Sequence, residues 1–400
     1  MKRIVFIRSY NFTKKEFNKL DVAFFLKKKI KVEFWSLIKL LKKKEIFDKS
    51  LFDKNLNIIF ISNLKNIFQK IEEFSDSETV YDVSIDIYNL TFFRILKKIS
   101  DSKKKFIISP KIEYLDKENI FFKTIRVIKN KSLLMLVTTF IKKSQIYLLN
   151  IFIQSLFYFN KIRPANYTYF LYKKNIYDNK NNKFISKKTK IIWGHQADYN
   201  NFIKLQKKKK KKDFILFLDQ NIPFHNDLRN LNSLDINPKE YYHSVSCFLK
   251  RIEISFNTRV HVSLHPRSDI HKMKKYFKNF TLSVGETPKK ILNSQFIILH
   301  ESTAVNLAVL FMKPLLIITN NSLINSLYPH NQEIKALASK LKKNILNIDE
   351  NFDFNVIKKN LYINKKNYGN FKNLYIKYKG NNKSRSENIY NRLIIDRVWI

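Results

Sequence analysis

The sequence predicts an α/β protein with two doubly wound parallel sheets, and three observations support this expectation. The chain has 400 residues, which is enough for two or three domains of ordinary size. Its composition is that of a globular protein, with 44% apolar, 14% aromatic and 27% charged residues. Short apolar runs alternate with helical patterns along most of the chain, as they do in βαβ units. We expect a first Rossmann-like domain over residues 1–205, a second over 213–345 and a helical tail over 346–400.

The first half of the chain opens with a strand, a helix and a second strand. The run RIVFI at 3–7 predicts the first strand, residues 14–28 carry the apolar spacing of a helix, and the apolar run 30–34 predicts the second strand. The same alternation then continues. Further strands are predicted at 57–61, 83–87 and 105–108, and further helices at 64–74 and 91–99. Strands separated by helices indicate an open parallel sheet.

A second series of strands and helices begins after the basic run 207–212. Strands are predicted at 214–218, 259–264, 296–299 and 315–319, helices at 238–250 and 304–311, and a helical stretch at 320–345. The spacing of these elements is that of a Rossmann-like half. Residues 386–399 predict a further helix at the end of the tail.

The chain is strongly basic, because 76 Lys and Arg residues face 33 Asp and Glu residues and leave a net charge of +43. Such an excess ordinarily indicates nucleic acid or an anionic surface as a partner. Here the charge is spread over the whole length, so we expect no nucleic acid partner. The run 207–212 is the one tight cluster, and we interpret it as a solvated loop, with a patch for phosphates or anionic lipid as the alternative. The charge predicts a salt-sensitive attraction to anionic ligands and membrane surfaces.

Several protein classes are excluded by the rarer residues. Only 4 Gly and 8 Pro occur, which excludes collagen-like and Pro-rich scaffolds. Cys247 is the single cysteine, so an internal disulfide and a thiolate zinc site are both excluded. The apolar stretch 132–159 is split by Lys142 and Lys143, which favours a buried or interfacial helix pair over a membrane span. We expect a cytoplasmic protein, with peripheral contact at the inner face of the cytoplasmic membrane as the alternative.

The first of two polar motifs follows the predicted strand 259–264, and the ends of strands are where open α/β sheets bind ligands. His265 comes directly after the strand, and Pro266 restricts its backbone to an extended conformation. Arg267 offers a planar fork that suits phosphate or carboxylate. The alternative is a strand end with a turn proline and surface polar residues.

The second motif, His300-Glu301-Ser302-Thr303, lies between the strand 296–299 and a helix predicted from Ala304. Ser302 or Thr303 can cap that helix, whose free N–H groups suit an anion. The alternative is an ordinary N-cap. Because we expect both motifs at the ends of successive strands, together they predict a site for a nucleotide phosphate.

The segment VSLHPRSD, followed by FIILHESTAVNLAVLFMKPLLIIT, resembles the C-terminal, nucleotide-binding half of GT-B glycosyltransferases that build bacterial surface polysaccharide. It is similar to the His-Pro-motif group that contains bacterial sialyltransferases, polysialyltransferases and capsule Kdo transferases. The resemblance covers roughly residues 213–320, and the run 3–35 also resembles an opening GT-B acceptor domain in its pattern. It implies a GT-B-like architecture, in which two Rossmann-like domains face each other across a cleft.

The resemblance also implies which residues bind the donor. These are His265, Pro266, Arg267, Glu301, Ser302 and Thr303. His265 would contact the donor phosphate and stabilise the leaving group, with Arg267 as its helper. The hydroxyls of Ser302 and Thr303 would also bind the phosphate, and Glu301 would reach the ribose.

The acidic catalytic motif of that group has no clear counterpart in this chain. Four carboxylates stay open as the catalytic base or as plain surface groups, namely Asp82, Asp86, Asp198 and Asp219. Asp198 and Asp219 lie near the expected interdomain region, so these two and His265 are our candidates for the catalytic residues.

The function that the resemblance implies is transfer of a sugar from a nucleotide-sugar donor to a lipopolysaccharide or capsule acceptor. We expect no cofactor and no metal, because the sequence lacks a DxD triplet, an HExxH motif and a phosphate-binding P-loop. Three alternatives remain. They are a non-hydrolysing nucleotide-sugar 2-epimerase, a basic nucleic-acid-binding protein, and an inactive relative that acts as an assembly subunit.

Overall fold

The computed structural model describes all of the chain except residues 42–54, 75–77, 85–89, 110–143, 145–147, 149–150, 153–154, 156–161, 181, 183, 209–212, 225–235, 327–330, 381 and 400. Most of the stretch 132–159, most of the run 207–212 and Asp86 therefore lie outside the described residues. Within the described residues, no helix combines the length and the apolar character that crossing a membrane requires.

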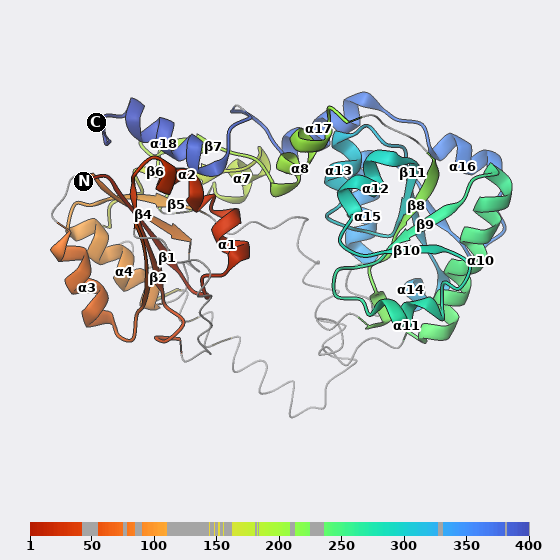
Figure 1. Cartoon of the computed structure of the whole chain (residues 1–400), viewed down its shortest axis with the longest axis horizontal. Coiled ribbons are helices and arrows are strands. Elements are labelled where there is room, and N and C mark those ends of the chain that lie inside the picture. The colour runs from red at the N-terminus through yellow and green to blue at the C-terminus, as the bar shows by residue number, and fades with distance from the viewer. Residues whose placement is uncertain are drawn as a thin grey trace. The chain divides into compact units, whose positions relative to one another are not determined.

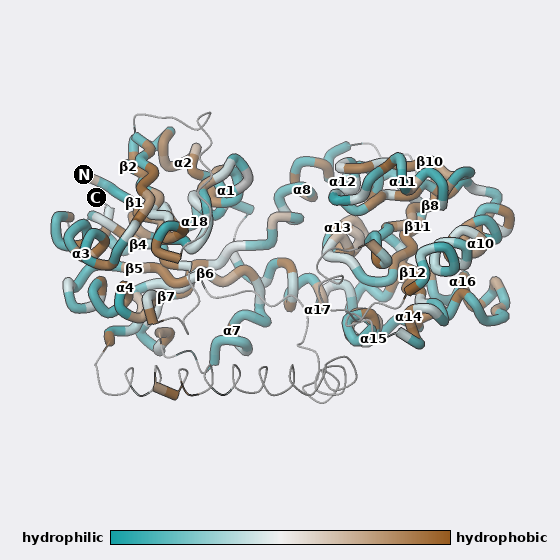
Figure 2. The backbone as a smooth tube through the Cα atoms, turned by 90° about the horizontal axis from the view of Figure 1, so that it is seen from below, coloured by the Kyte–Doolittle hydropathy of each residue, from teal (hydrophilic) through white to brown (hydrophobic). Residues whose placement is uncertain are grey.

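The described residues divide into two compact units, each with a sheet of its own (Figure 1). The first unit contains the described residues of Met1–Ile112, Thr138–Ala197 and Lys377–Ile400. The second contains those of Asp198–Ile376. Apolar residues concentrate in the strands of both units, and hydrophilic residues mark helices such as α3 and α15 (Figure 2).

The sheet of the first unit has seven parallel strands in the order β3-β2-β1-β4-β5-β6-β7. The strands are β1 Arg3–Arg8, β2 Lys31–Ser36, β3 Leu56–Phe60, β4 Thr79–Ser84, β5 Lys105–Ile108, β6 Tyr167–Phe170 and β7 Lys190–Trp193. The helices are α1 Lys14–Lys19, α2 Val22–Lys27, α3 Leu64–Glu73, α4 Leu90–Asp101, α7 Lys174–Asp178 and α18 Arg385–Ile395. The chain builds outward from β1 to β3 and then returns to β4, so the sheet is doubly wound.

Both faces of this sheet are buried, and β1 shows how its sequence achieves this. Side chains alternate between the two faces of a strand. Ile4 and Phe6 pack in the core that contains residues of α2 and α18, whereas Val5 and Ile7 pack in the core that contains residues of α3 and α4. A continuous apolar run is therefore what a doubly covered parallel strand requires.

The sheet of the second unit has six parallel strands in the order β10-β9-β8-β11-β12-β13. The strands are β8 Phe214–Leu218, β9 Val260–Ser263, β10 Thr281–Ser283, β11 Ser294–Leu299, β12 Leu315–Thr319 and β13 Ile345–Asn347. In chain order this is the 3-2-1-4-5-6 arrangement of a Rossmann sheet, whose switch point lies between β8 and β11. The prediction of two Rossmann-like, doubly wound α/β domains is confirmed.

Helices cover both faces of the second sheet, with α12, α13 and α15 on one side and α10 on the other (Figure 1). The helices of this unit are α8 Ala197–Leu205, α10 Pro238–Phe256, α11 Ile270–Lys274, α12 Thr287–Asn293, α13 Val305–Leu310, α14 Asn321–Asn325, α15 Asn331–Leu341, α16 Phe354–Asn360 and α17 Lys365–Tyr375. A short 3-10 helix, η2 Ile222–Phe224, follows β8. The described residues of these elements share one apolar core.

Three predicted elements differ from the structure. The strand predicted at 83–87 begins earlier, since β4 is Thr79–Ser84 and residues 85–87 lie outside the described residues. The helix predicted over 14–28 is divided into α1 and α2, because the backbone of Asp21 adopts the left-handed conformation, with a φ of 50°. The helical stretch predicted over 320–345 consists of α14 and α15, followed by the short strand β13.

The predicted tail 346–400 is helical, but its helices belong to both units. α16 and α17 pack in the core of the second unit, whereas α18 packs in the first. Ile389 and Leu393 of α18 are fully buried there, and the Trp399 ring meets that of Phe25 edge-on at 6.1 Å. The apolar faces of these helices complete the two cores, so the residues after 345 form no separate domain.

A buried ion network joins the last part of the chain to the first sheet. Asp82 of β4 is fully buried and binds two guanidinium groups, at 2.8 Å from Arg8 and 2.7 Å from Arg385. Arg385 also donates to the Ser109 hydroxyl at 2.8 Å. Burial alone would raise the pKa of Asp82, but the charges of Arg385 and Arg8 hold that pKa below its usual value.

We predict that Asp82→Asn destabilises the first unit by about 3–5 kcal/mol, because the guanidinium groups of the buried Arg8 and the partly buried Arg385 lose their counter-charge. The three tryptophans, Trp35, Trp193 and Trp399, all lie in the first unit, so urea unfolding followed by tryptophan fluorescence measures this unit. The exposed Asp101, which pairs with Lys97, provides the control, and Asp101→Asn should change the stability by less than about 1 kcal/mol. Equal effects of the two substitutions would contradict the buried network.

The stabilising contribution of Asp82 also fixes the sign of a pH effect. Because its pKa is lower in the folded than in the unfolded chain, this stability is present above the unfolded pKa and is lost as the pH falls through the folded pKa. Acidification should therefore lower the free energy of unfolding less in Asp82→Asn than in the parent protein. Urea unfolding followed by tryptophan fluorescence measures this difference.

Candidate functional site

The candidate residues gather at the carboxyl edge of the second sheet. Leu218, at the end of β8, pairs with Ser263 on β9 and with Leu299 on β11. His265 comes two residues after Ser263, Gln220 two residues after Leu218, and Glu301 two residues after Leu299. The two motifs are not on adjacent strands, because β8 lies between β9 and β11 in the sheet and β10 lies between them in the sequence. Their strand ends are about 10 Å apart at the usual spacing of strands.

His265 has a defined ring orientation. Its Nδ1 accepts a hydrogen bond from the backbone N–H of Arg267 at 3.2 Å. In the neutral imidazole this contact places the ring proton on Nε2, which is then the donor to an anionic group. The ring is half-buried, and both Pro266 and Arg267 are exposed. The turn closes with a hydrogen bond from the Ser268 N–H to the His265 carbonyl at 2.9 Å.

The loop after β8 bridges the switch point of the sheet. The Gln220 Oε1 atom accepts a hydrogen bond from the Glu301 N–H at 3.2 Å. Asn221, the next residue, has a φ of 56°, a left-handed backbone that Asn tolerates better than most residues. This turn leads directly into η2. The sequence around Gln220 carries no signal for this contact, because it depends on the strand order of the sheet.

Asp219 has the most strongly perturbed carboxyl group of the site. It is only 4% exposed, and neither of its carboxylate oxygens has a hydrogen-bond partner of normal geometry among the described residues. Burial raises its pKa to about 7, and the nearby N–H groups of Asn221 and Gln220 oppose that rise. The neighbouring hydroxyls of Tyr241 and Tyr242 have pKa values that burial and Asp219 raise. Asp219 is therefore no surface carboxylate, and it holds a proton up to near-neutral pH.

His300 is a packing residue rather than part of an open site. Its ring is fully buried, with Nδ1 at 2.9 Å from the Ile318 carbonyl and Nε2 at 2.9 Å from the Tyr241 hydroxyl. Burial lowers its pKa to about 4, so the imidazole is neutral at physiological pH. It joins β11 to β12 and to α10.

Ser302 supports the start of α13. Its hydroxyl accepts a hydrogen bond from the Ala304 N–H at 3.2 Å, and its carbonyl accepts one from the Val305 N–H at 3.1 Å. Ser302 is half-buried and Thr303 is exposed. The N-cap of α13 is Ala304, without a side-chain cap hydrogen bond, so Ser302 forms a turn before the helix and is not its N-cap. α13 has only six residues, which limits the contribution of its dipole to binding an anion.

The remaining carboxylates fall into different environments. Asp198 of α8 accepts a hydrogen bond from Asn306 of α13 at 3.0 Å, and burial raises its pKa. It is half-buried and lies against the helix that follows the second motif. Asp82 belongs to the buried ion network of the first unit, so it is excluded as the base. Among the residues that the structure describes, no group of three or more His, Cys, Asp or Glu side chains could hold a metal ion.

We predict that the second unit loses stability as the pH rises toward neutrality, because Asp219 binds its proton more tightly in the folded chain. Between about pH 5 and about pH 8 the loss should be about 3 kcal/mol, and Asp219→Asn should remove most of it. Urea unfolding is followed by circular dichroism, which reports both units, and by tryptophan fluorescence, which identifies the transition of the first unit; the remaining circular-dichroism transition then measures the second. Asp213 is exposed at the opposite end of β8, and Asp213→Asn should keep the pH dependence of the parent. A parent protein without this pH dependence would contradict the assignment.

No family model matches this chain, and no curated protein matches it. Several solved structures resemble it over most of its length, among them the following three. The wall teichoic acid polymerase TagF is 10% identical with a TM-score of 0.49, covering 99% of this chain and 89% of that chain. The calicheamicin glycosyltransferase CalG4 is 8% identical with a TM-score of 0.44, covering 92% of both chains. The UDP-GlcNAc 2-epimerase of Methanocaldococcus jannaschii, in complex with UDP-GlcNAc and UDP, is 15% identical with a TM-score of 0.43, covering 99% and 100%. At these identities and TM-scores the likeness carries no information on substrate or activity.

Proposed function

We propose that this protein is a glycosyltransferase that transfers a sugar from a nucleotide-sugar donor to a bacterial surface glycan, such as lipopolysaccharide or capsule. One observation carries the proposal. His265, Gln220 and Glu301 follow the carboxyl ends of three neighbouring strands, β9, β8 and β11. Sheets with this strand order bind nucleotides at the switch point between their first and fourth strands, which here are β8 and β11. The His-Pro and Ser-Thr motifs of the sequence resemblance occupy this same edge.

The donor phosphate would be held by groups that are neutral donors or cations. The Nε2 proton of His265 would donate to a phosphate oxygen, and Arg267 would supply a planar, charged fork. The hydroxyl of Thr303 and that of Ser302 would complete the contacts. These donors stabilise the charge that develops on the leaving nucleotide, which is the main electrostatic demand of the reaction.

The acceptor hydroxyl needs a base. Asp198 and Asp219 are the candidates, because burial raises the pKa of both carboxyl groups. A base whose pKa lies near the working pH transfers protons most effectively. Asp198 is the more accessible of the two, since it is half-buried and Asp219 is almost fully buried. An acceptor carried on lipid would bring the protein to the inner face of the membrane, where its charge favours anionic lipids.

We expect a thermal-shift screen of CMP-, UDP-, GDP- and CDP-linked sugars to find a nucleotide that stabilises the parent protein. His265→Ala should lose this stabilisation and keep the melting temperature of the free protein, because its ring is half-buried at a strand end. The exposed His271 on α11 gives a matched control, and His271→Ala should respond as the parent does. A ligand response that is unchanged in His265→Ala would remove the proposed donor site.

The transfer itself is tested with the identified nucleotide sugar and a bacterial glycan acceptor. Product should form only when the acceptor is present, whereas an epimerase would convert the nucleotide sugar alone. Because the proposed site neutralises the phosphate with protein groups, activity should persist in excess EDTA. Complete loss of activity on chelation, with recovery on adding Mg²⁺ or Mn²⁺, would contradict the metal-independent reaction.

A further inference from the structure

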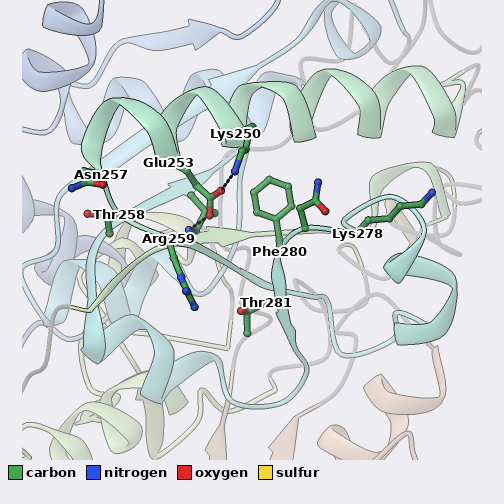
Figure 3. Close-up of a pocket in the computed structure, with 10 residues that line it drawn as sticks. Lys250, Glu253, Asn257, Thr258, Arg259, Lys278, Phe280 and Thr281 are labelled. Atoms are coloured by element: carbon green, nitrogen blue, oxygen red, sulfur yellow. Dashed lines mark hydrogen bonds and ion pairs between the residues drawn. The ribbon is translucent and has the colours of Figure 1, made fainter.

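A hollow lies at the edge of the second sheet opposite the candidate donor site (Figure 3). It has a volume of about 670 Å³ and is lined by the last turns of α10 and by residues that lead into β9 and β10. His265 follows the carboxyl end of β9, whereas Arg259 precedes its amino end, so this hollow is separate from the proposed donor site. Its size is within the range of ligand-binding pockets.

One carboxylate of the hollow is fully engaged. The Glu253 Oε1 atom accepts a hydrogen bond from the Val260 N–H at 2.8 Å, and Oε2 pairs with the Lys250 ammonium at 3.1 Å. Glu253 thus fixes the turn between α10 and β9 and cancels the charge of Lys250. Arg259 and Lys278 are exposed, and no carboxylate of the described residues pairs with either of them. The hollow therefore keeps two uncompensated positive charges, which favour an anionic ligand.

The wall of the hollow also carries a flat apolar surface. The Phe280 ring is half-buried and packs edge-on against Phe277, with the ring centres 6.2 Å apart. Its other side faces the hollow beside Lys250 (Figure 3). Asn257, Asn279 and Thr281 add amide and hydroxyl groups.

We infer that this hollow binds an anionic saccharide. The aromatic ring of Phe280 suits the C–H face of a sugar, and the amides and the hydroxyl suit its hydroxyl groups. The guanidinium fork of Arg259 matches a carboxylate or a phosphate. A flat membrane is a poorer partner, because the ring lies inside a recess and contributes no protruding apolar group. That the saccharide is a second segment of the acceptor glycan rests on the proposed glycosyltransferase function.

The test compares a charged probe with a neutral probe that has the same sugars. A short oligogalacturonate carries a carboxylate on each sugar, and its methyl ester has the same sugars without charge. The double variant Arg259→Ala/Lys278→Ala removes the two cations of the hollow. Its matched control, Lys358→Ala/Lys359→Ala, removes two exposed cations from α16. Phe280→Leu keeps an apolar contact with Phe277 and removes the flat ring.

Isothermal titration calorimetry should show that the parent and the control bind oligogalacturonate alike. The Arg259→Ala/Lys278→Ala variant should bind at least about tenfold more weakly, since two charge-assisted contacts are lost. Phe280→Leu should also bind more weakly, and the methyl ester should bind weakly to every protein. An equal loss of affinity in the two double variants would mean that only the overall charge of the protein matters, and it would overturn the inference. Stronger binding to phosphatidylglycerol vesicles than to the saccharide, lost in Arg259→Ala/Lys278→Ala, would overturn it in favour of lipid.

The two proposals fail in different ways. His265→Ala should lose the nucleotide response and bind oligogalacturonate as the parent does, whereas Arg259→Ala/Lys278→Ala should show the reverse. A protein that binds the saccharide in this hollow and responds to no nucleotide sugar would retain the present inference and lose the proposed function.

Discussion

Burial of both faces of each parallel sheet is the constraint on which the rest of this structure depends. Strands such as β8, with the sequence FILFL, have helices on either side and carry no polar side chain. In the second sheet, the candidate polar residues accordingly lie beyond the strand ends, where the chain leaves the core. His265, Gln220 and Glu301 come two residues beyond the level ends of three neighbouring strands. The place of the candidate site follows from the burial that shapes the sheet.

Two aspartates show how differently this constraint can be met. Asp82 lies within β4 and is neutralised by Arg8 and Arg385, so it remains ionised and stabilises the fold. Asp219 lies one residue beyond β8, near two tyrosines and no guanidinium group of the described residues, so it retains its proton instead. Burial is common to both, and the charged neighbours decide the outcome. Asp82 therefore stabilises the fold, whereas Asp219 can exchange a proton near neutral pH.

The alternation of strands and helices could be predicted where apolar runs are long, as at β1, β8 and β12. β10 has three residues, TLS, and carries no such pattern, which is why its place between the two motifs could not be predicted. The contact between Gln220 and Glu301 spans 81 residues, and that between Asp82 and Arg385 spans 303. Pairings of this kind depend on strand order, which periodicity does not reveal. The left-handed turn at Asp21 could not be predicted either, since the residues on both sides continue the helical spacing.

The contact between Trp399 and residues early in the sequence has a consequence for folding during synthesis. The Trp399 indole N–H donates to the Glu78 carbonyl at 2.6 Å, within the same unit as the first strand. The first unit therefore cannot complete its core until residue 399 has been synthesised. The described residues of the second unit lie within Asp198–Ile376, so this unit can become compact before residue 399 is made. Although β1 is synthesised before any strand of the second sheet, the unit that contains it is completed after the second unit.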